Sequence, residues 1–248
     1  MEGKPPQILP VKPLPKPKPR KILHPNLPVL PCIMVLVAPT KSGKTSLLTN
    51  LLLRDDFYKD VHDNVTIMSN TIESDETGRF LKQACDCYVG YDDGILGGII
   101  NQQKQFDVDE RPFIGLLFDD ILGSVKRSSY LNSLVTRSRH FGVGLLAISV
   151  QSFKSLGPTI RNNCNAFICM NLQNMSELVK ISEEYNGMFG GDKNFRKIYA
   201  KATEDRYGFL YLDLQSNPAR AFRNFEEQLA EGDQLLFDGG SVELKVPD

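Results

Sequence analysis

The sequence has no apolar run long enough to cross a membrane as a helix. Such a helix needs about 18 or more consecutive apolar residues, and no stretch of the 248-residue chain approaches this length. The amino-terminal stretch is rich in proline and lysine and lacks the apolar segment of a secretory signal. We therefore expect neither a membrane span nor a secretory signal.

Residues suited to a disulfide framework or a structural metal are also scarce. The chain has five cysteines, an odd number without a C-x-x-C pair, and three histidines without metal-ligand spacing. We expect free thiols in a reducing compartment, and neither paired cysteines nor a zinc site.

An excess of positive charge is missing as well. The chain has 29 Lys and Arg against 30 Asp and Glu, a net charge of −1. Proteins that coat themselves in nucleic acid are usually more basic, so any contact with DNA must be local, and composition alone does not suggest DNA. The length and the 41% hydrophobic content fit one α/β domain with extensions.

What the sequence does contain is a phosphate-binding motif. An apolar stretch at 32–37 leads into a short polar loop, and a helix-like apolar run continues to about residue 53. A buried strand, a turn and a helix in this order are typical of a P-loop. The residues predicted to surround the phosphates of ATP are Ala38, Pro39, Thr40, Lys41, Ser42, Gly43, Lys44, Thr45 and Ser46.

Each part of this loop has a predicted role. The backbone N–H groups of residues 40–45 would surround a polyphosphate at the positive end of the helix. Lys44 would reach the β- and γ-phosphates, and the Thr45 hydroxyl would bind Mg²⁺. The pattern has glycine at its first position, where this chain has Ala38. The alternative is a polar turn with a surface lysine.

A second motif is an apolar strand, residues 112–118, that ends in Asp119-Asp120. This is the Walker B arrangement, in which Asp119 would hold Mg²⁺ through water and Asp120 would act as general base on the attacking water. The alternative is an exposed acidic pair that starts a turn before Gly123. The same residues fit the D-x-x-G pattern of GTPases, but no N-K-x-D sequence occurs, so that interpretation is weak.

Further candidate site residues lie before and after the predicted strand at 144–149. Gln151 lies just beyond a strand at 144–149, where its amide would contact a γ-phosphate or the attacking water; otherwise it is a surface residue. Arg137 and Arg139 end the preceding helix, and Arg161 follows later. They are either ordinary cations near a helix end or candidates for an arginine finger that reaches a neighbour's nucleotide.

Strand and helix patterns alternate along the chain. We predict strands at 32–37, 64–69, 87–91, 112–118, 144–149, 166–170 and 207–214, and helices ending near 53 and at 73–84, 93–105, 129–140, 176–185 and 192–201. Continuous apolar strands between helices predict an α/β fold, with a mainly parallel sheet covered by helices on both faces.

The two ends of the chain differ from the middle. Residues 1–31 contain ten of the fifteen prolines and should form an extended arm, either a solvated tether or a segment that docks on a neighbour. Residues 226–248 contain seven acids and should be a helix end and a weakly ordered tail. We thus expect an arm at 1–31, an ATPase domain at 32–225 and an acidic extension at 226–248.

One predicted helix carries four basic residues at helical spacing. A stripe of this kind is usually a solvated face and sometimes a DNA-facing patch. Its members are Lys193, Arg196, Lys197 and Lys201.

Taken together, the motifs resemble those of the DNA-packaging ATPases of large eukaryotic DNA viruses, of the poxvirus type, within the FtsK/HerA superfamily. The resemblance covers about residues 30–215 and keeps the family's order. It rests on the loop 38–45, the strand 116–120, Thr-Arg-Ser-Arg-His-Phe-Gly at 136–142, Gln151-Ser152 and Pro-Thr-Ile-Arg-Asn-Asn at 158–163.

The resemblance implies a RecA-like P-loop ATPase that assembles as a ring, a pentamer or hexamer, with ATP and Mg²⁺ at subunit interfaces. It implies translocation of double-stranded viral DNA into a preformed capsid, with a capsid protein as partner, at the assembly site in the cytoplasm or nucleus of a host cell or in the virion. It gives Lys44, Thr45, Asp119, Asp120 and Gln151 the family's nucleotide roles. Arg139 is our choice of trans finger, ahead of Arg137 and Arg161. Family members commonly have Glu where this chain has Asp120.

Two other functions compete with this hypothesis. A P-loop kinase acting on a small molecule would need a substrate lid and a cluster of acceptor-binding arginines, and it leaves Gln151 without a purpose. A non-catalytic, nucleotide-bound assembly protein would use the proline-rich arm, but an intact Asp119-Asp120 pair argues against it.

Overall fold

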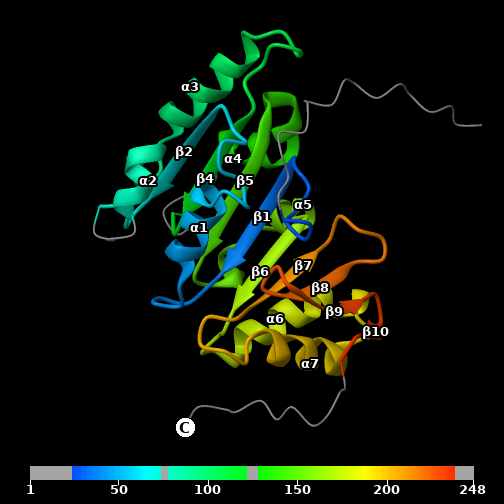
Figure 1. Cartoon of the computed structure of the whole chain (residues 1–248). Helices are drawn as coiled ribbons and strands as arrows, with labels where there is room; N and C mark the ends of the chain where they lie inside the picture. Colours follow the sequence, from blue (N-terminus) through cyan, green and yellow to red (C-terminus); the bar gives the residue numbers. More distant parts are fainter. Residues whose placement is uncertain (1–23, 74–77, 122–127, 238–248) are drawn as a thin grey trace, which may run out of the picture.

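The computed structural model describes residues 24–73, 78–121 and 128–237. These residues form a ten-stranded sheet in the order β10-β9-β8-β7-β6-β1-β5-β4-β2-β3 (Figure 1). The strands are β1 (Cys32–Val37), β2 (Asn64–Ser69), β3 (Asp86–Val89), β4 (Ile114–Asp119), β5 (Val143–Val150), β6 (Ala166–Met170), β7 (Phe209–Asp213), β8 (Arg220–Arg223), β9 (Glu227–Glu231) and β10 (Gln234–Leu235). The helices are α1 (Lys44–Leu53), α2 (Gly78–Ala84), α3 (Asp93–Lys104), α4 (Ser129–Arg137), α5 (Pro158–Asn163), α6 (Met175–Tyr185) and α7 (Asp192–Ala202), with short 3₁₀ turns η1 (Ser138–Phe141), η2 (Phe153–Ser155) and η3 (Asn186–Met188).

The sheet has a parallel part and an antiparallel part. Strands β6, β1, β5, β4, β2 and β3 pair in parallel, whereas β7 to β10 continue from β6 in antiparallel pairs. The carboxyl ends of the parallel strands therefore meet at one edge, where ligands bind in open α/β sheets. The predicted α/β fold with a mainly parallel sheet is confirmed.

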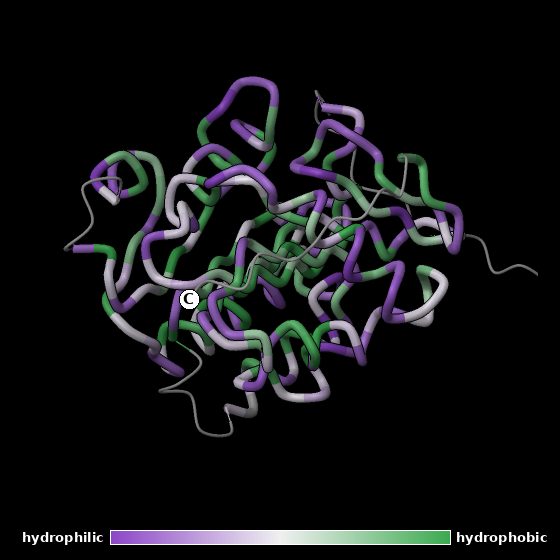
Figure 2. Tube along the Cα trace, turned by 90° about the horizontal axis from the view of Figure 1, so that it is seen from below, coloured by the Kyte–Doolittle hydropathy of each residue, from purple (hydrophilic) through white to green (hydrophobic). Residues whose placement is uncertain are grey.

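Helices cover both faces of the sheet because the buried side chains of each strand alternate in direction. On β1, Val35 packs in a cluster with α3 to α7, and Met34 packs in a second cluster with α1 and α2. Both clusters also take in residues of the antiparallel part, among them Ala221 and Phe222. Figure 2 shows the apolar strands gathered at the centre, with hydrophilic segments around them. The two parts of the sheet thus share their core.

Polar caps fix where several of these helices begin. The Asp92 side chain accepts hydrogen bonds from the N–H groups of Gly94 and Ile95, at 2.7 and 3.1 Å, at the start of α3. Ser128 accepts from the N–H of Leu131, 3.0 Å away, in the first turn of α4. Such caps satisfy N–H groups that a helix leaves unpaired and are worth about 1 kcal/mol each.

The prediction of a helix end after Glu226 is wrong for the residues that the structure describes. Glu227–Glu231 form β9 and Gln234–Leu235 form β10. The acidic residues pair with arginines of β8: Glu231 lies opposite Arg220, and a carboxylate oxygen of Glu227 lies 3.6 Å from a guanidinium nitrogen of Arg223. The acidic composition suggested a tail, but these acidic residues lie on a strand whose neighbour, β8, carries arginines.

The last residues of the predicted arm pack against the domain. Leu27 is buried, and the Tyr58 hydroxyl donates a 2.6 Å hydrogen bond to the carbonyl of Pro28. The Asn26 amide donates to the carbonyl of Phe225 at 2.7 Å. Residues 1–23 of the arm and 238–248 of the acidic extension lie outside the described residues, so the three-part division stays a prediction.

No helix within residues 24–73, 78–121 and 128–237 is both long enough and apolar enough to cross a bilayer.

Candidate functional site

The predicted phosphate loop lies between β1 and α1, at the edge where the parallel strands end (Figure 1). Gly43 caps α1 with a φ of 97°. This left-handed conformation is strained for residues with a Cβ atom and easy for glycine. A Cβ there would also lie 3.3 Å from Cδ1 of Tyr207. The loop needs glycine at this position for both reasons.

The alanine that replaces glycine at the start of the motif fits without strain. Ala38 is fully buried and is not among the residues with positive φ. Its N–H donates to the carbonyl of Val150, 3.0 Å away, and so continues the ladder between β1 and β5. Since the backbone there is in a region open to any residue, the departure from the glycine pattern does not disturb the loop.

Lys44 lies buried between the two predicted Walker B carboxylates. It is 9% exposed, its ammonium is 3.2 Å from Oδ1 of Asp119, and it forms an ion pair with Oδ2 of Asp120. Charges removed from water cost several kcal/mol each unless they are paired. The start of α1 and the end of β4 are thus held together by one cation and two acids.

Asp119 is fixed by the strands on either side of it. In the register of the sheet, Asp119 lies between Ser69 of β2 and Ser149 of β5. The Ser69 hydroxyl donates to Oδ2 at 3.0 Å, and the Ser149 hydroxyl donates to Oδ1 at 2.8 Å. Sequence reasoning did not identify these serines. The available signal was that each stands at the end of a predicted strand.

The backbone bends at Asp120, directly after β4. Its φ is 53°, a left-handed conformation that is uncommon outside glycine but tolerated by aspartate. The turn is held by its N–H, which donates to the carbonyl of Ser149 at 3.0 Å, and by its carbonyl, which accepts from the Asn70 amide at 2.9 Å. The Gln151 amide donates to Oδ2 of Asp120 at 3.1 Å. Three predicted residues, Lys44, Asp120 and Gln151, are thereby in one hydrogen-bonded group.

The three candidate arginines lie elsewhere. Arg137 ends α4 and Arg139 lies in η1, before the amino end of β5, and both are exposed. Gln151 follows the carboxyl end of this eight-residue strand, and eight residues of strand span about 26 Å. Arg161 lies in α5, where it pairs with Glu184 at 3.0 Å and lies over the ring of Phe153. None of the three contributes to the Lys44 group of its own chain.

The predicted basic stripe on α7 is partly neutralised. Nε of Arg196 is 2.7 Å from a carboxylate oxygen of Asp192, and Nζ of Lys201 is 2.9 Å from one of Glu204. The pairing favours the interpretation of the stripe as a solvated face.

The residues predicted to bind Mg²⁺ have suitable chemistry. Thr45 offers a hydroxyl in the first turn of α1, and Asp119 offers a carboxylate held in one orientation by two serines. Oxygen ligands of this kind, with water and phosphate oxygens completing the set, are what Mg²⁺ prefers. The described part of the chain has no cluster of three His, Cys, Asp or Glu side chains that would form a site without a nucleotide.

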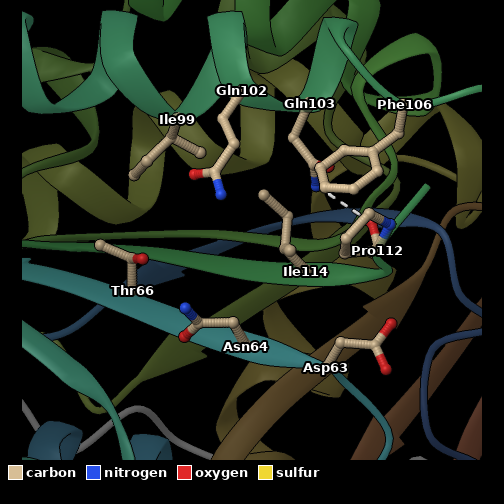
Figure 3. A pocket seen from close by; sticks show the side chains of 9 residues that line it. All are labelled: Asp63, Asn64, Thr66, Ile99, Gln102, Gln103, Phe106, Pro112 and Ile114. Atoms are coloured by element: carbon tan, nitrogen blue, oxygen red, sulfur yellow. Dashed lines mark hydrogen bonds between the residues drawn. The ribbon is translucent and has the colours of Figure 1, made fainter.

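A cavity of about 270 Å³ lies away from this group, beneath α3 (Figure 3). Asn64 and Ile114, which line it, are the first residues of β2 and β4, so it is at the amino ends of the parallel strands. The Gln103 amide donates to the carbonyl of Pro112 across it, at 3.0 Å. This cavity belongs to the opposite edge of the sheet from the phosphate loop.

The comparisons with known proteins identify the fold. No family model and no curated protein matches the sequence. Among solved structures, the DNA-packaging ATPase B204 from Sulfolobus turreted icosahedral virus aligns with a TM-score of 0.56 and 17% identity, over 80% of this chain and 97% of that one. The genome-packaging NTPase B204 from Sulfolobus turreted icosahedral virus 2, in complex with AMPPCP, aligns with a TM-score of 0.56 and 20% identity, over 77% of this chain and 96% of that one. The same protein in complex with ATP-γ-S aligns with a TM-score of 0.54 and 19% identity, over 77% of this chain and 95% of that one. At these identities the similarity shows a shared α/β fold, in agreement with the strand order described above.

Proposed function

We propose that this chain is an ATPase that uses hydrolysis to move double-stranded DNA into a preformed viral capsid. The observation that carries the proposal is the convergence of Lys44, Asp119, Asp120 and Gln151 at the carboxyl edge of the parallel strands. Two further observations support it. The fold is similar to that of structures described as viral packaging ATPases, and the order of the motifs resembles that of the poxvirus-type family.

In this proposal, ATP binding exchanges the partners of Lys44. In the structure, the Lys44 ammonium contacts Asp119 and Asp120. When the phosphates of ATP occupy the loop, the N–H groups of residues 40–45 donate to them, and the ammonium turns to the β- and γ-phosphates. This frees the carboxylate of Asp120 for a water molecule.

Hydrolysis then depends on Asp120 and its neighbours. Asp120 accepts a proton from the attacking water as the water oxygen bonds to the γ-phosphorus and the bond to the β–γ bridging oxygen breaks, which releases ADP and phosphate. The Gln151 amide, 3.1 Å from Asp120, orients that carboxylate and the water. Asp119 and Thr45 would hold Mg²⁺, which would offset charge on the phosphates.

The proposal also gives neighbouring subunits a part in hydrolysis. Arg139 and Arg137 are exposed, without a carboxylate partner in the described residues, and lie at the edge opposite Lys44. In this proposal one of them serves the nucleotide of a neighbour, as a finger that offsets charge on the transferring phosphoryl group. Arg161 is already paired with Glu184, so Arg139 stays the first choice. We therefore propose a ring with ATP at its interfaces, which acts with a capsid protein at the viral assembly site of the host cell or in the virion.

Steady-state ATP hydrolysis with and without linear duplex DNA tests the proposal. We expect DNA to stimulate turnover, Lys44→Ala to abolish it, and Asp120→Asn to lower it by about 10²–10⁴-fold, with thermal melting confirming that both variants fold. Turnover indifferent to DNA would favour a small-molecule phosphotransferase. Tight ATP binding with no turnover, with or without DNA, would favour a nucleotide-bound assembly protein.

A further inference from the structure

The antiparallel part of the sheet brings its own loops to the edge that holds the phosphate loop. β7 runs opposite to β6, so its first residue, Phe209, lies beside Met170 at the carboxyl end of β6. β8 runs opposite to β7, so its last residue, Arg223, lies beside Leu210. The loop before β7 and the turn after β8 are therefore placed next to residues 38–45.

An exposed aromatic side chain lies in the first of these loops. Tyr207 is 57% exposed, although its ring approaches the phosphate-loop glycine, with Cδ1 only 3.3 Å from the place of a Cβ on Gly43. The Arg206 guanidinium lies over the ring, 5.2 Å from its centre. Among the described residues, Tyr207 is one of the large apolar side chains left most open to solvent.

Beside Tyr207 is a cavity of about 240 Å³, bounded on one side by Leu47 and Asn50 of α1. Its floor is aromatic, since the rings of Phe57, Phe209 and Phe225 line it and those of Phe209 and Phe225 are 5.2 Å apart. The lining as a whole is mixed, apolar and polar in similar measure. Small-ligand sites combine aromatic and apolar side chains with polar groups that fix the orientation of the ligand.

Five polar or charged residues line the cavity, two of them amides: His24, Asn50, Arg54, Asn224 and Glu226. Asn50 donates through Nδ2 to the carbonyl of Ser46 at 2.7 Å, and Asn224 accepts through Oδ1 from the N–H of Phe209 at 3.2 Å. One acceptor on Asn50 and one donor group on Asn224 remain for a ligand.

The position of the cavity indicates which part of a ligand it would take. The carboxylates of Asp119 and Asp120 lie on the β5–β4 side of β1, so the γ-phosphate of a nucleotide on residues 38–45 must point to that side. The opposite end of the nucleotide then points to the β6–β7 side, where Tyr207 and the cavity are. Aromatic rings stack on nucleobases of any type, because every base has a π-face.

We propose that this cavity holds the base of the bound nucleotide and that Tyr207 is the platform on which the base stacks. The proposal rests on the nucleotide binding proposed above and deepens it, because it assigns the base to the antiparallel part of the sheet and the phosphates to the parallel part.

Calorimetry with ADP, ATP and inorganic tripolyphosphate tests the assignment. Stacking on one aromatic ring is worth about 1–3 kcal/mol, which is roughly fivefold to 150-fold in affinity. Tyr207→Ala should therefore weaken the binding of ADP and ATP by about tenfold or more and leave the affinity for tripolyphosphate unchanged. Tyr207→Phe should bind all three ligands as the wild type does. Unchanged ATP affinity in Tyr207→Ala would overturn the proposal, and so would an equal loss for tripolyphosphate, which would make Tyr207 a support of the phosphate loop.

The same titrations separate this proposal from the one on which it rests. If the wild-type chain binds neither ATP nor tripolyphosphate, the phosphate site itself fails. If it binds both equally tightly, and Lys44→Ala loses both, the phosphate site stands and the base platform is refuted.

The absence of tryptophan from the chain gives a second readout. Tyr207→Trp introduces the sole indole, and its fluorescence should be quenched by ATP and not by tripolyphosphate. Tyr88→Trp is the matched control, since Tyr88 is 38% exposed on β3, the far edge strand of the sheet, and should not respond. A Tyr207→Trp signal that is silent to bound ATP, or that responds equally to tripolyphosphate, would contradict the proposal.

Discussion

The parallel and antiparallel parts of the sheet contribute different chemistry to one edge of the molecule. In the parallel part, polar residues stand at neighbouring strand ends, and Ser69, Asp119 and Ser149 lie side by side in register. In the antiparallel part, strands that run both ways bring connecting loops to the edge, and Tyr207 lies in one of them. The charged residues of the candidate site thus stand at strand ends, whereas the proposed base platform lies in a loop.

Burial differs in the same way. Lys44 and Asp119 are buried, each in contact with an opposite charge, whereas Tyr207 is more than half exposed. Buried ion pairs hold a geometry in place because breaking one leaves an unpaired charge. The Tyr207 ring borders an open cavity and is exposed apart from its contacts with Arg206 and Gly43. The two parts thus separate a rigid group of charges from an accessible binding surface.

The comparison predicts that acids in the two parts respond differently to loss of charge. Asp120→Asn should lower kcat by about 10²–10⁴-fold, because it removes the general base, while ATP still binds. Asp213→Asn is the matched change in the antiparallel part, where Asp213 is buried and pairs with Arg220 at 2.6 Å. It should cost about 1–3 kcal/mol of stability and leave kcat unchanged. Rate measurements with chemical denaturation check both; a large kcat loss in Asp213→Asn would break the comparison.

A second prediction asks whether the two parts fold as one unit. Phe118 of β4 and Phe222 of β8 are each no more than 2% exposed, and phenylalanine-to-alanine changes in a core cost about 3–5 kcal/mol. Because both clusters of the core extend into the antiparallel part, each variant should show a single, earlier urea transition by circular dichroism. A two-step transition in Phe222→Ala alone would mean that the antiparallel part unfolds independently.

A third prediction concerns the serines that orient Asp119. Ser149→Ala should reduce ATP turnover by about 10–100-fold and raise the Mg²⁺ concentration needed for half-maximal rate, as for other groups that orient metal ligands. Ser182→Ala is the control, since Ser182 is buried and donates to a carboxylate, that of Asp192, outside the site. If both variants need the same Mg²⁺ concentration as the wild type, Ser149 is only structural.

The smallest expected effect is that of restoring the glycine of the motif. Ala38→Gly removes a buried methyl group and adds backbone freedom in the unfolded chain, at a cost of about 0.5–1 kcal/mol. Turnover should stay the same, because Ala38 is not among the residues with positive φ. A marked rise in turnover would show that the alanine limits the phosphate loop.

The parallel part could be predicted from the sequence in detail. The predicted strands 32–37 and 64–69 coincide with β1 and β2, and the predicted strand 112–118 differs by one or two residues from β4, Ile114–Asp119. These strands are apolar runs bounded by polar residues, so hydrophobic pattern alone identifies them. The P-loop and the Asp119-Asp120 pair follow such strands, which is why their meeting could be expected.

The antiparallel part could not be predicted to the same extent. β9 has only Leu229 and Ala230 fully buried among polar residues, and it is stabilised by pairing with β8 rather than by its own pattern. Strand pairing also explains why the role of Ser149, in the parallel part, could not be predicted: that role depends on the register that places Ser149 beside Asp119. The approach of Tyr207 to Gly43 joins distant stretches of chain, and no local signal in the sequence reports it.

The measurement that tests the central claim most directly is a crystal structure of the chain with Mg²⁺ and a non-hydrolysable ATP analogue. We predict the triphosphate on residues 38–45, the Lys44 ammonium moved from Asp120 to the phosphates, and the base against Tyr207. A nucleotide whose base lies on the β5–β4 side of β1, or whose phosphates lie away from residues 38–45, would contradict the account.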